Sequence, residues 1–173
     1  MSDVILFAPF VKKWEGDFSN DPLDSGGATM HGITLYTFRV YCRAKKLPIP
    51  TVQDLKNISD EMWLDVLKTM FWDRWKADLI INQSVANLLV DFVWASGKWG
   101  IKIPQRVLGI QDDGIVGNIT LSTLNKRNQK EFFDKVWGER IKFLQNIVKN
   151  NPTQKRFIKG WVNRLNGLTF KAL

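Results

Sequence analysis

Residues 4–34 read VILFAPFVKKWEGDFSNDPLDSGGATMHGIT, and this stretch joins two unlike kinds of sequence. In its first part an apolar stripe recurs at the spacing of one helix face, which predicts an apolar helix; its residues are Val4, Phe7, Phe10, Val11 and Trp14. From residue 16 to residue 34 the pattern gives way to about nineteen residues rich in Gly, Asp, Asn, Pro and Ser, which favour turns. Long ordered loops in small domains usually carry function, so we expect a site where this helix ends.

Helical spacing dominates the rest of the chain, and no convincing strand pattern is present. Thr34 is placed to cap a helix that reaches about Lys45, and Ser59 opens the next one. We place Pro104 in the first turn of a short helix that ends at Leu108, because proline suits that position. Further helices are expected over about 85–96, around 121–124, after a cap at Asn128, and from about 152. The predicted fold class is therefore all-α, mainly helical, with a small irregular loop or β-hairpin insertion at about 16–34.

The size and composition of the chain restrict its class. A length of 173 residues suffices for one domain or two closely packed halves, and 45% hydrophobic with 24% charged residues is typical of a globular protein. The expected seam lies near Ser96–Pro104 and divides the chain into residues 1–96 and 97–173, packed as one compact unit. No apolar run approaches the roughly 18–20 residues that a bilayer requires, so we expect no transmembrane helix. Asp3 and Pro9 argue against a signal peptide.

Two residue types are nearly absent, and this limits the possible chemistry. Cys42 is the single cysteine and His31 the single histidine, which excludes an internal disulfide and a cysteine- or imidazole-based zinc site. A calcium loop is an alternative for residues 17–24, which hold three acids, but the spacing does not fit an EF-hand. We expect no metal and no cofactor.

The chain is basic, with 25 Lys and Arg residues against 17 Asp and Glu and a formal net charge of +8. Such a surface attracts polyanions such as nucleic acid, anionic lipid or an acidic cell-wall polymer, and composition alone does not choose among them. The bases are densest after residue 125, where a solvated helix face explains them as well as a binding surface does. No nucleic-acid-binding motif is present, so we expect no nucleic-acid partner.

Glu15 is the best candidate for catalysis. A carboxyl group at the end of an apolar helix lies half in the core, and desolvation raises its pKa toward the range that a general acid requires. Asp21 and Asp24, or the hydroxyl of Thr29, lie on the following loop and are placed to position a water molecule, as glycosidases require. The alternative interpretation is a solvated helix terminus followed by turn-forming aspartates.

The same stretch resembles the signature of glycoside hydrolase family 108, lysozyme-like N-acetylmuramidases of bacteria and phages that are sometimes labelled secretion activators. That family's pattern runs roughly E-G-G-Y and then D-P-x-D-x-G-G-x-T-x-x-G-I-T. The matching positions are Glu15-Gly16, Asp21-Pro22, Asp24, Gly26-Gly27, Thr29 and Gly32-Ile33-Thr34. The family's essential glutamate falls on Glu15. Asp17 and Phe18 depart from the pattern, since the family has Gly and Tyr there.

The resemblance extends beyond this loop. Residues 105–121 and 160–165 look like the predicted peptidoglycan-binding region that follows the catalytic part in these proteins. The resemblance therefore implies a lysozyme-like catalytic part at 1–96 and a helical peptidoglycan-binding part at 97–173. It also implies peptidoglycan glycan strands as the partner. Among the tryptophans, Trp99 between two glycines is our candidate for an exposed sugar platform.

These observations together predict a peptidoglycan hydrolase that cleaves the β-1,4 bond between N-acetylmuramic acid and N-acetylglucosamine. Glu15 is the expected acid, Asp24 and Thr29 its helpers, and Asp21, His31 and Trp99 the substrate-binding residues. We expect inversion at the anomeric carbon, with Glu15 and Asp24 roughly 6.5–9.5 Å apart.

The remaining expectations concern the state of the protein and its place of action. We expect a monomer that is made in the cytoplasm and acts on the cell wall after release or non-Sec export. The alternative is a peptidoglycan-binding accessory protein of a secretion or prophage apparatus that does not cut its ligand.

Overall fold

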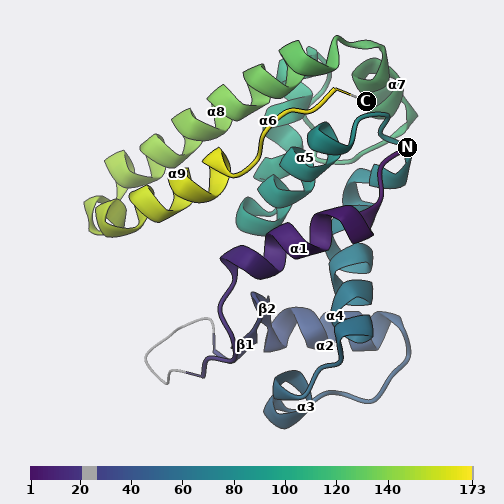
Figure 1. Cartoon of the computed structure of the whole chain (residues 1–173), viewed down its shortest axis with the longest axis vertical. Coiled ribbons are helices and arrows are strands. Elements are labelled where there is room, and N and C mark those ends of the chain that lie inside the picture. Colours follow the sequence, from purple (N-terminus) through teal and green to yellow (C-terminus); the bar gives the residue numbers. More distant parts are fainter. Residues whose placement is uncertain (21–26, 173) are drawn as a thin grey trace. The chain divides into compact units, whose positions relative to one another are not determined.

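The computed structural model describes residues 1–20 and 27–172, and this part of the chain is mainly helical with one small hairpin (Figure 1). It forms two compact units, one of Val4–Asp73 and one of Met1–Asp3 with the chain from Arg74 onward. None of the helices in the described ranges is long and apolar enough to cross a membrane. The predicted fold class is confirmed, and the functional division at residues 96 and 97 stays a prediction.

The Val4–Asp73 unit combines short helices with the hairpin. Its elements are α1 (Val4–Trp14), β1 (Thr29–Met30), β2 (Ile33–Thr34), α2 (Leu35–Ala44), α3 (Val52–Lys56), α4 (Asp60–Leu67) and the π-helical turn η1 (Lys68–Trp72). Phe7 and Val11 of α1 are fully buried, as are Trp63 and Trp72. The apolar face predicted for the first helix is therefore the face that packs into the core of this unit.

The hairpin occupies the C-terminal part of the predicted insertion. β1 and β2 are antiparallel, with Thr29 opposite Thr34 and Met30 opposite Ile33. His31 and Gly32 form the connection with φ angles of 45° and 78°, the pair of positive values that a tight type I′ turn requires. Thr34 then caps α2, because its side-chain oxygen accepts a hydrogen bond from the Thr37 amide (3.1 Å).

The second unit is a helical body. Its helices are α5 (Gln83–Ser96), α6 (Trp99–Leu108), α7 (Asn118–Lys126), α8 (Gln129–Asn150) and α9 (Ile158–Asn166), with 3₁₀ turns at Ala77–Leu79 (η3) and Pro152–Phe157 (η4). A further 3₁₀ turn, η2, spans Asp73–Trp75. Gly97 ends α5 and Asn128 caps α8, both as predicted from the sequence.

The prediction for Pro104 was wrong. It lies in the middle of α6, which begins at Trp99 rather than near residue 104. A proline there cannot donate to the carbonyl four residues earlier, that of Gly100. The buried indole N–H of Trp75 donates to that carbonyl instead (3.1 Å), so the helix continues through the proline without a buried oxygen losing its partner.

A buried ion triad fixes three helices of this unit. Asp91 of α5 is fully buried and accepts hydrogen bonds from Arg140 of α8 (2.7 Å) and Arg164 of α9 (2.7 Å). Burial alone would raise the pKa of Asp91, but the charges of the two guanidinium groups and their hydrogen bonds outweigh it and hold the pKa below its ordinary value. The paired charges therefore serve the packing of α5, α8 and α9.

Candidate active site

Glu15 follows directly after the last residue of α1. Its amide donates to the carbonyl of Val11 (3.1 Å), so the helical hydrogen-bond pattern reaches this residue, and its side chain is half-buried. Val11 is itself fully buried. The packed turn before it thus fixes the backbone from which the Glu15 carboxyl group projects, as the sequence predicts.

The chain after Glu15 turns back to pair with the hairpin. Ser19 and Thr29 form a two-way backbone bridge, with N···O distances of 2.9 and 2.8 Å. Only residues 16–18 separate Glu15 from this pairing, so the end of α1 and the half-buried Thr29 belong to one small region. The bridge therefore links Thr29 to a segment that begins directly after Glu15, and the catalytic roles of both residues stay a prediction.

Two buried polar atoms in the same unit have no hydrogen-bond partner among the described residues. They are the indole nitrogen of Trp14, the residue before Glu15, and Nδ1 of His31 in the hairpin turn. The His31 backbone is well held, because its carbonyl accepts a hydrogen bond from the Trp63 indole (3.2 Å). Buried polar atoms without partners are rare, and these two lie directly before Glu15 in the chain and in the hairpin turn.

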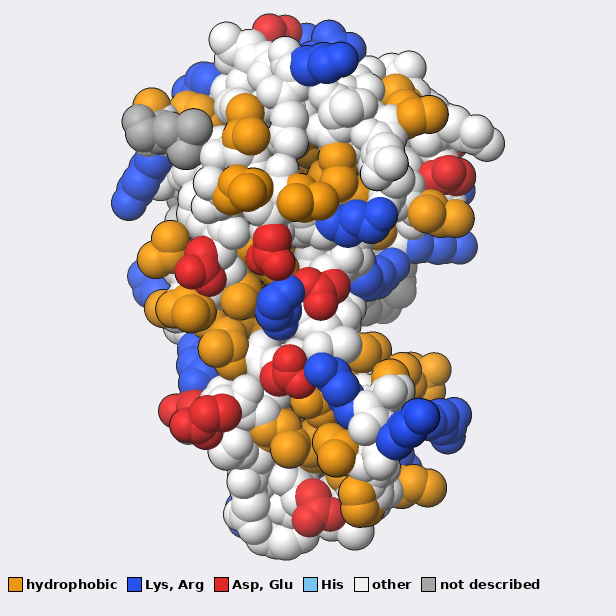
Figure 2. Space-filling view, turned by 90° about the vertical axis from the view of Figure 1, so that its right-hand side faces the viewer, with side chains coloured by type: hydrophobic (Ala, Val, Ile, Leu, Met, Phe, Trp, Pro, Cys, Tyr) orange, Lys and Arg blue, Asp and Glu red, His pale blue; other side chains and the backbone are white. Residues whose placement is uncertain are grey.

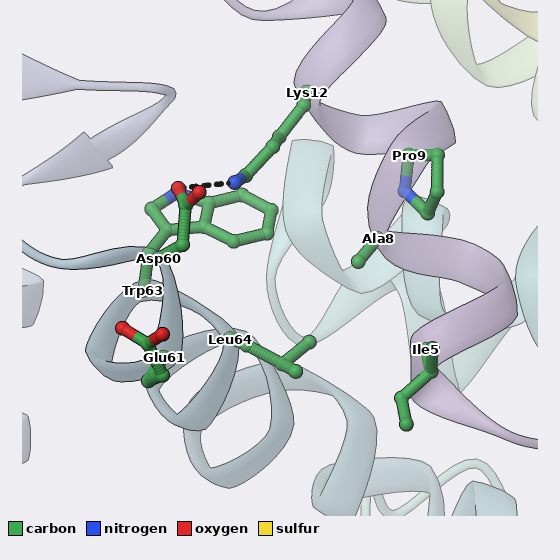
Figure 3. Close-up of a pocket in the computed structure, with 8 residues that line it drawn as sticks. All are labelled: Ile5, Ala8, Pro9, Lys12, Asp60, Glu61, Trp63 and Leu64. Carbon is green, nitrogen blue, oxygen red and sulfur yellow. Dashed lines mark hydrogen bonds and ion pairs between the residues drawn. The ribbon is translucent and has the colours of Figure 1, made fainter.

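A groove of about 410 Å³ lies between α1 and the start of α4 (Figure 3). Lys12 reaches across it, where its ammonium pairs with Asp60 (2.6 Å) and lies 4.9 Å from the centre of the Trp63 ring. The hydrogen bond from Lys12 lowers the pKa of Asp60. The other lining residues are Ile5, Ala8, Pro9, Glu61 and Leu64.

The groove face of α1 continues toward the candidate acid. Ala8, Lys12 and Glu15 follow at spacings of four and three, which places them along one side of a helix. Sequence reasoning missed this groove. The available signal was a second stripe along α1, separate from the stripe of core residues. It consists of Ile5, Ala8, Pro9 and Lys12.

The other predicted residues divide into three groups. Asp21 and Asp24 lie outside the described residues. The predicted separation of roughly 6.5–9.5 Å between Glu15 and Asp24 therefore stays a prediction. Trp99 lies in the second unit, at the start of α6, with 38% of its surface exposed. Of the two departures from the family pattern, Asp17 is exposed and Phe18 is half-buried, with the Lys56 ammonium 5.4 Å from its ring centre.

The described ranges hold no group of three or more His, Cys, Asp or Glu side chains arranged for a metal ion. Cys42 is buried in α2, and burial raises the pKa of its thiol. A thiol in that environment is a weak nucleophile.

Comparisons with known proteins show the family of the chain. Residues 8–97 match the family model described as "Glycosyl hydrolase 108", and residues 99–166 match the model described as "Predicted Peptidoglycan domain". Among solved structures, "Structure of Brucella abortus SagA" superposes with a TM-score of 0.79 and 26% sequence identity, over 95% of this chain and 90% of that one. A search of curated proteins finds no match. Because the first model covers more than half of the chain, the protein belongs to the glycosyl hydrolase 108 family and carries the predicted peptidoglycan domain after it.

Proposed function

We propose that the protein is a peptidoglycan hydrolase that cleaves the β-1,4 bond between N-acetylmuramic acid and N-acetylglucosamine, with Glu15 as the general acid. One observation carries the proposal: within the segment that matches the hydrolase family, Glu15 is held at the end of a packed helix, three residues from the pairing with β1. A half-buried carboxyl group on a helix end whose backbone is fixed suits the protonation of a glycosidic oxygen.

In the proposed reaction, the Glu15 carboxylic acid donates its proton to the glycosidic oxygen as the bond to the anomeric carbon breaks. Charge develops on the sugar ring in an oxocarbenium-like transition state, and a water molecule attacks the opposite face. The Thr29 hydroxyl orients that water, and Asp24 accepts its proton, which gives inversion. Asp21 and His31 contact the sugars.

The groove between α1 and α4 supports the choice of a glycan chain as substrate. It offers an apolar floor at Ala8 and Leu64 and a charged end at Lys12 and Asp60, which suits the C–H faces and the polar substituents of linked sugars. The proposal includes action on the cell wall after release from the cytoplasm, by a monomeric protein.

The test is clearance of a suspension of purified cell walls by the Glu15→Gln variant. We expect a loss of about 10²–10⁴-fold in the initial rate, the range typical of general acids. The melting temperature should stay unchanged or rise slightly, because a functional carboxyl group in a partly desolvated position costs stability.

Glu131→Gln is the matched control, since this glutamate is exposed on α8 and pairs only with Lys135 among the described residues. It should clear walls at the parental rate. Clearance by Glu15→Gln at that rate would remove Glu15 from the mechanism.

A second candidate function is binding to peptidoglycan without cleavage. Asp17 favours it, because an exposed acid stands where the family pattern has glycine, two residues from the proposed acid. A parental protein that sediments with cell walls and releases no fragments would support this alternative.

A further inference from the structure

We propose that Trp99 and the three cations around it, Lys98, Lys102 and Arg106, form a binding site for a carboxylate-bearing sugar unit of peptidoglycan. We call these four residues the Trp99 site. The inference rests on the proposed function for its substrate class only, because it requires no cleavage. Residues 99–166 match the "Predicted Peptidoglycan domain", and the inference says where in this part of the chain peptidoglycan would bind.

The backbone beneath Trp99 is held rigidly by close helix packing. Gly97 ends α5 with a φ of 56°, and α6 begins two residues later. A Cβ atom on Gly100 would lie 2.3 Å from the Val93 amide nitrogen, so only glycine permits this approach of the two helices. The Trp75 indole binds the Gly100 carbonyl as well. Trp99 therefore projects from a fixed corner of the fold.

The ring of Trp99 is supported on one side and open on another. Its centre lies 6.4 Å from that of Phe143 on α8, and 38% of the residue remains exposed. An indole that is fixed and partly exposed needs little reorganisation to stack on the C–H face of a sugar. The site thus offers a partly exposed aromatic ring on a fixed backbone.

Three cations gather around this one ring. The ammonium groups of Lys98 and Lys102 each lie 5.8 Å from its centre, and the Arg106 guanidinium lies at 5.7 Å. The sequence produces this arrangement because residues 98, 102 and 106 are four apart and recur on one side of a helix. The Trp99 ring lies within reach of all three.

The charges of the Trp99 site are not balanced within the protein. Arg106 pairs with Asp112 (2.6 Å), and the Asp113 carboxylate is hydrogen-bonded to the Gln105 side chain and the Ile115 amide. Lys98 and Lys102 form no ion pair with any described residue, although Lys102 helps to lower the pKa values of both aspartates. On α8, by contrast, Lys130, Lys135 and Lys142 each pair with a neighbouring carboxylate.

This grouping brings like charges together, and Asp112 and Asp113 offset only part of their repulsion. Like charges near one another repel, and Lys98 also stands at the N-terminal end of α6, where the helix dipole disfavours a cation. On the face in Figure 2, lysine and arginine side chains are instead spread among acidic and hydrophobic ones. An anion bound beside Lys98 and Lys102 would relieve the remaining repulsion, and the neighbouring ring favours an anion attached to a group with an apolar face.

Peptidoglycan presents this combination of groups. Its sugar rings offer C–H faces for the indole, and the peptide stems attached to muramic acid carry carboxylates within reach of the surrounding cations. The Trp99 site therefore fits a muropeptide unit, with the sugar on Trp99 and a stem carboxylate near Lys98 and Lys102.

The experiment measures binding of the full chain to insoluble peptidoglycan that has been freed of other wall polymers. All variants carry Glu15→Gln, so that the wall is not consumed. We expect Trp99→Ala and the double variant Lys98→Gln/Lys102→Gln each to weaken binding about tenfold, a loss equivalent to one stacking or charged contact. The double variant should also bind with a weaker dependence on salt, and its melting temperature should equal or exceed that of the parent.

A matched double variant, Lys149→Gln/Lys159→Gln, removes the same charge from two other exposed positions of the same unit. It should change binding by less than about twofold, because screened charges away from the contact contribute little. The chemical control uses peptidoglycan whose carboxylates have been converted to amides. The parent should bind this material as weakly as the Lys98→Gln/Lys102→Gln protein binds untreated peptidoglycan.

Parental binding by both Trp99-site variants would overturn the inference, and so would equal losses in the Lys149→Gln/Lys159→Gln control. Undiminished binding to amidated peptidoglycan would overturn the assignment of a carboxylate. None of these outcomes affects the role of Glu15, which is tested by wall clearance; conversely, clearance by Glu15→Gln would overturn the proposed mechanism and leave the Trp99 site standing.

Discussion

The end of α1 and the corner between α5 and α6 hold their functional side chains by different means. Glu15 follows a packed helix, and among the described residues the chain beyond it is held by the Ser19–Thr29 bridge, a hairpin of two-residue strands and the hydrogen bond from Trp63 to His31. Trp99 stands on a corner where two helices approach too closely for a Cβ atom. The comparison indicates that the candidate chemistry lies beside short local backbone pairings, whereas the proposed binding platform lies on a dense scaffold of packed helices.

The dense scaffold should be the more sensitive of the two to substitution. Asp91→Asn removes the negative charge between Arg140 and Arg164. Both guanidinium groups then lack their counter-ion, and that of Arg140 is almost fully buried. Breaking a buried ion pair costs about 3–5 kcal/mol, so the free energy of unfolding should fall by that amount in a urea titration. A loss below about 1 kcal/mol would show that the triad does not hold these helices.

The pH dependence of stability provides the control for this variant. The folded-state pKa of Asp91 is lowered, so the unfolded chain takes up a proton at higher pH than the folded chain does. The stability from Asp91 is therefore fully present above about pH 4, its ordinary pKa range, and is lost as the pH falls through the lower folded-state pKa. Asp91→Asn should unfold with a smaller dependence on pH in this acidic range than the parent.

Gly100→Ala tests the close approach of α5 and α6 with a smaller expected effect. The added methyl group meets the backbone of Phe92 and Val93, so the helices must separate. Overpacking of this kind costs about 1–3 kcal/mol. Gly138→Ala is the matched control, since no atom lies within 4 Å of a Cβ built at that position of α8, and it should be neutral or stabilising. Equal stability of the two variants would contradict the account of the corner.

Thr34→Ala tests the hairpin region and has the smallest expected effect on stability. Loss of the hydrogen bond to the Thr37 amide should cost about 1 kcal/mol, as for other helix caps. Thr34→Ser keeps the capping oxygen and should restore most of that loss in the same thermal unfolding measurement. A cost as large as that of Asp91→Asn would mean that the hairpin region is held as firmly as the helical unit.

Local signals in the sequence predicted much of the fold. Thr34, Ser59 and Asn128 each cap the helix expected of them, because a cap depends on a side chain and the backbone three residues away. The short helix α3 was missed although its signal was available: Thr51 and Asp54 form a reciprocal capping box.

Errors arose where distant residues decide the outcome. Pro104 was placed at a helix start because proline suits the first turn of a helix. Its actual position inside α6 depends on a hydrogen bond from Trp75, a residue 29 positions away in the chain. The Trp99 site illustrates the same limit. Its tryptophan was selected from the sequence, but the support from Phe143 on α8 depends on helix packing. The backbone positions of Glu15 and Thr29 depend on residues near in sequence and on the adjacent bridge, whereas their catalytic roles stay a prediction.

The most direct test of the central claim is an analysis of the fragments that the parental protein releases from purified peptidoglycan. Chemical reduction followed by mass spectrometry identifies which sugar carries each new reducing end. We predict new reducing ends at N-acetylmuramic acid, produced by the parent and not by Glu15→Gln. New reducing ends at N-acetylglucosamine, or cut peptide stems with intact glycan strands, would contradict the account.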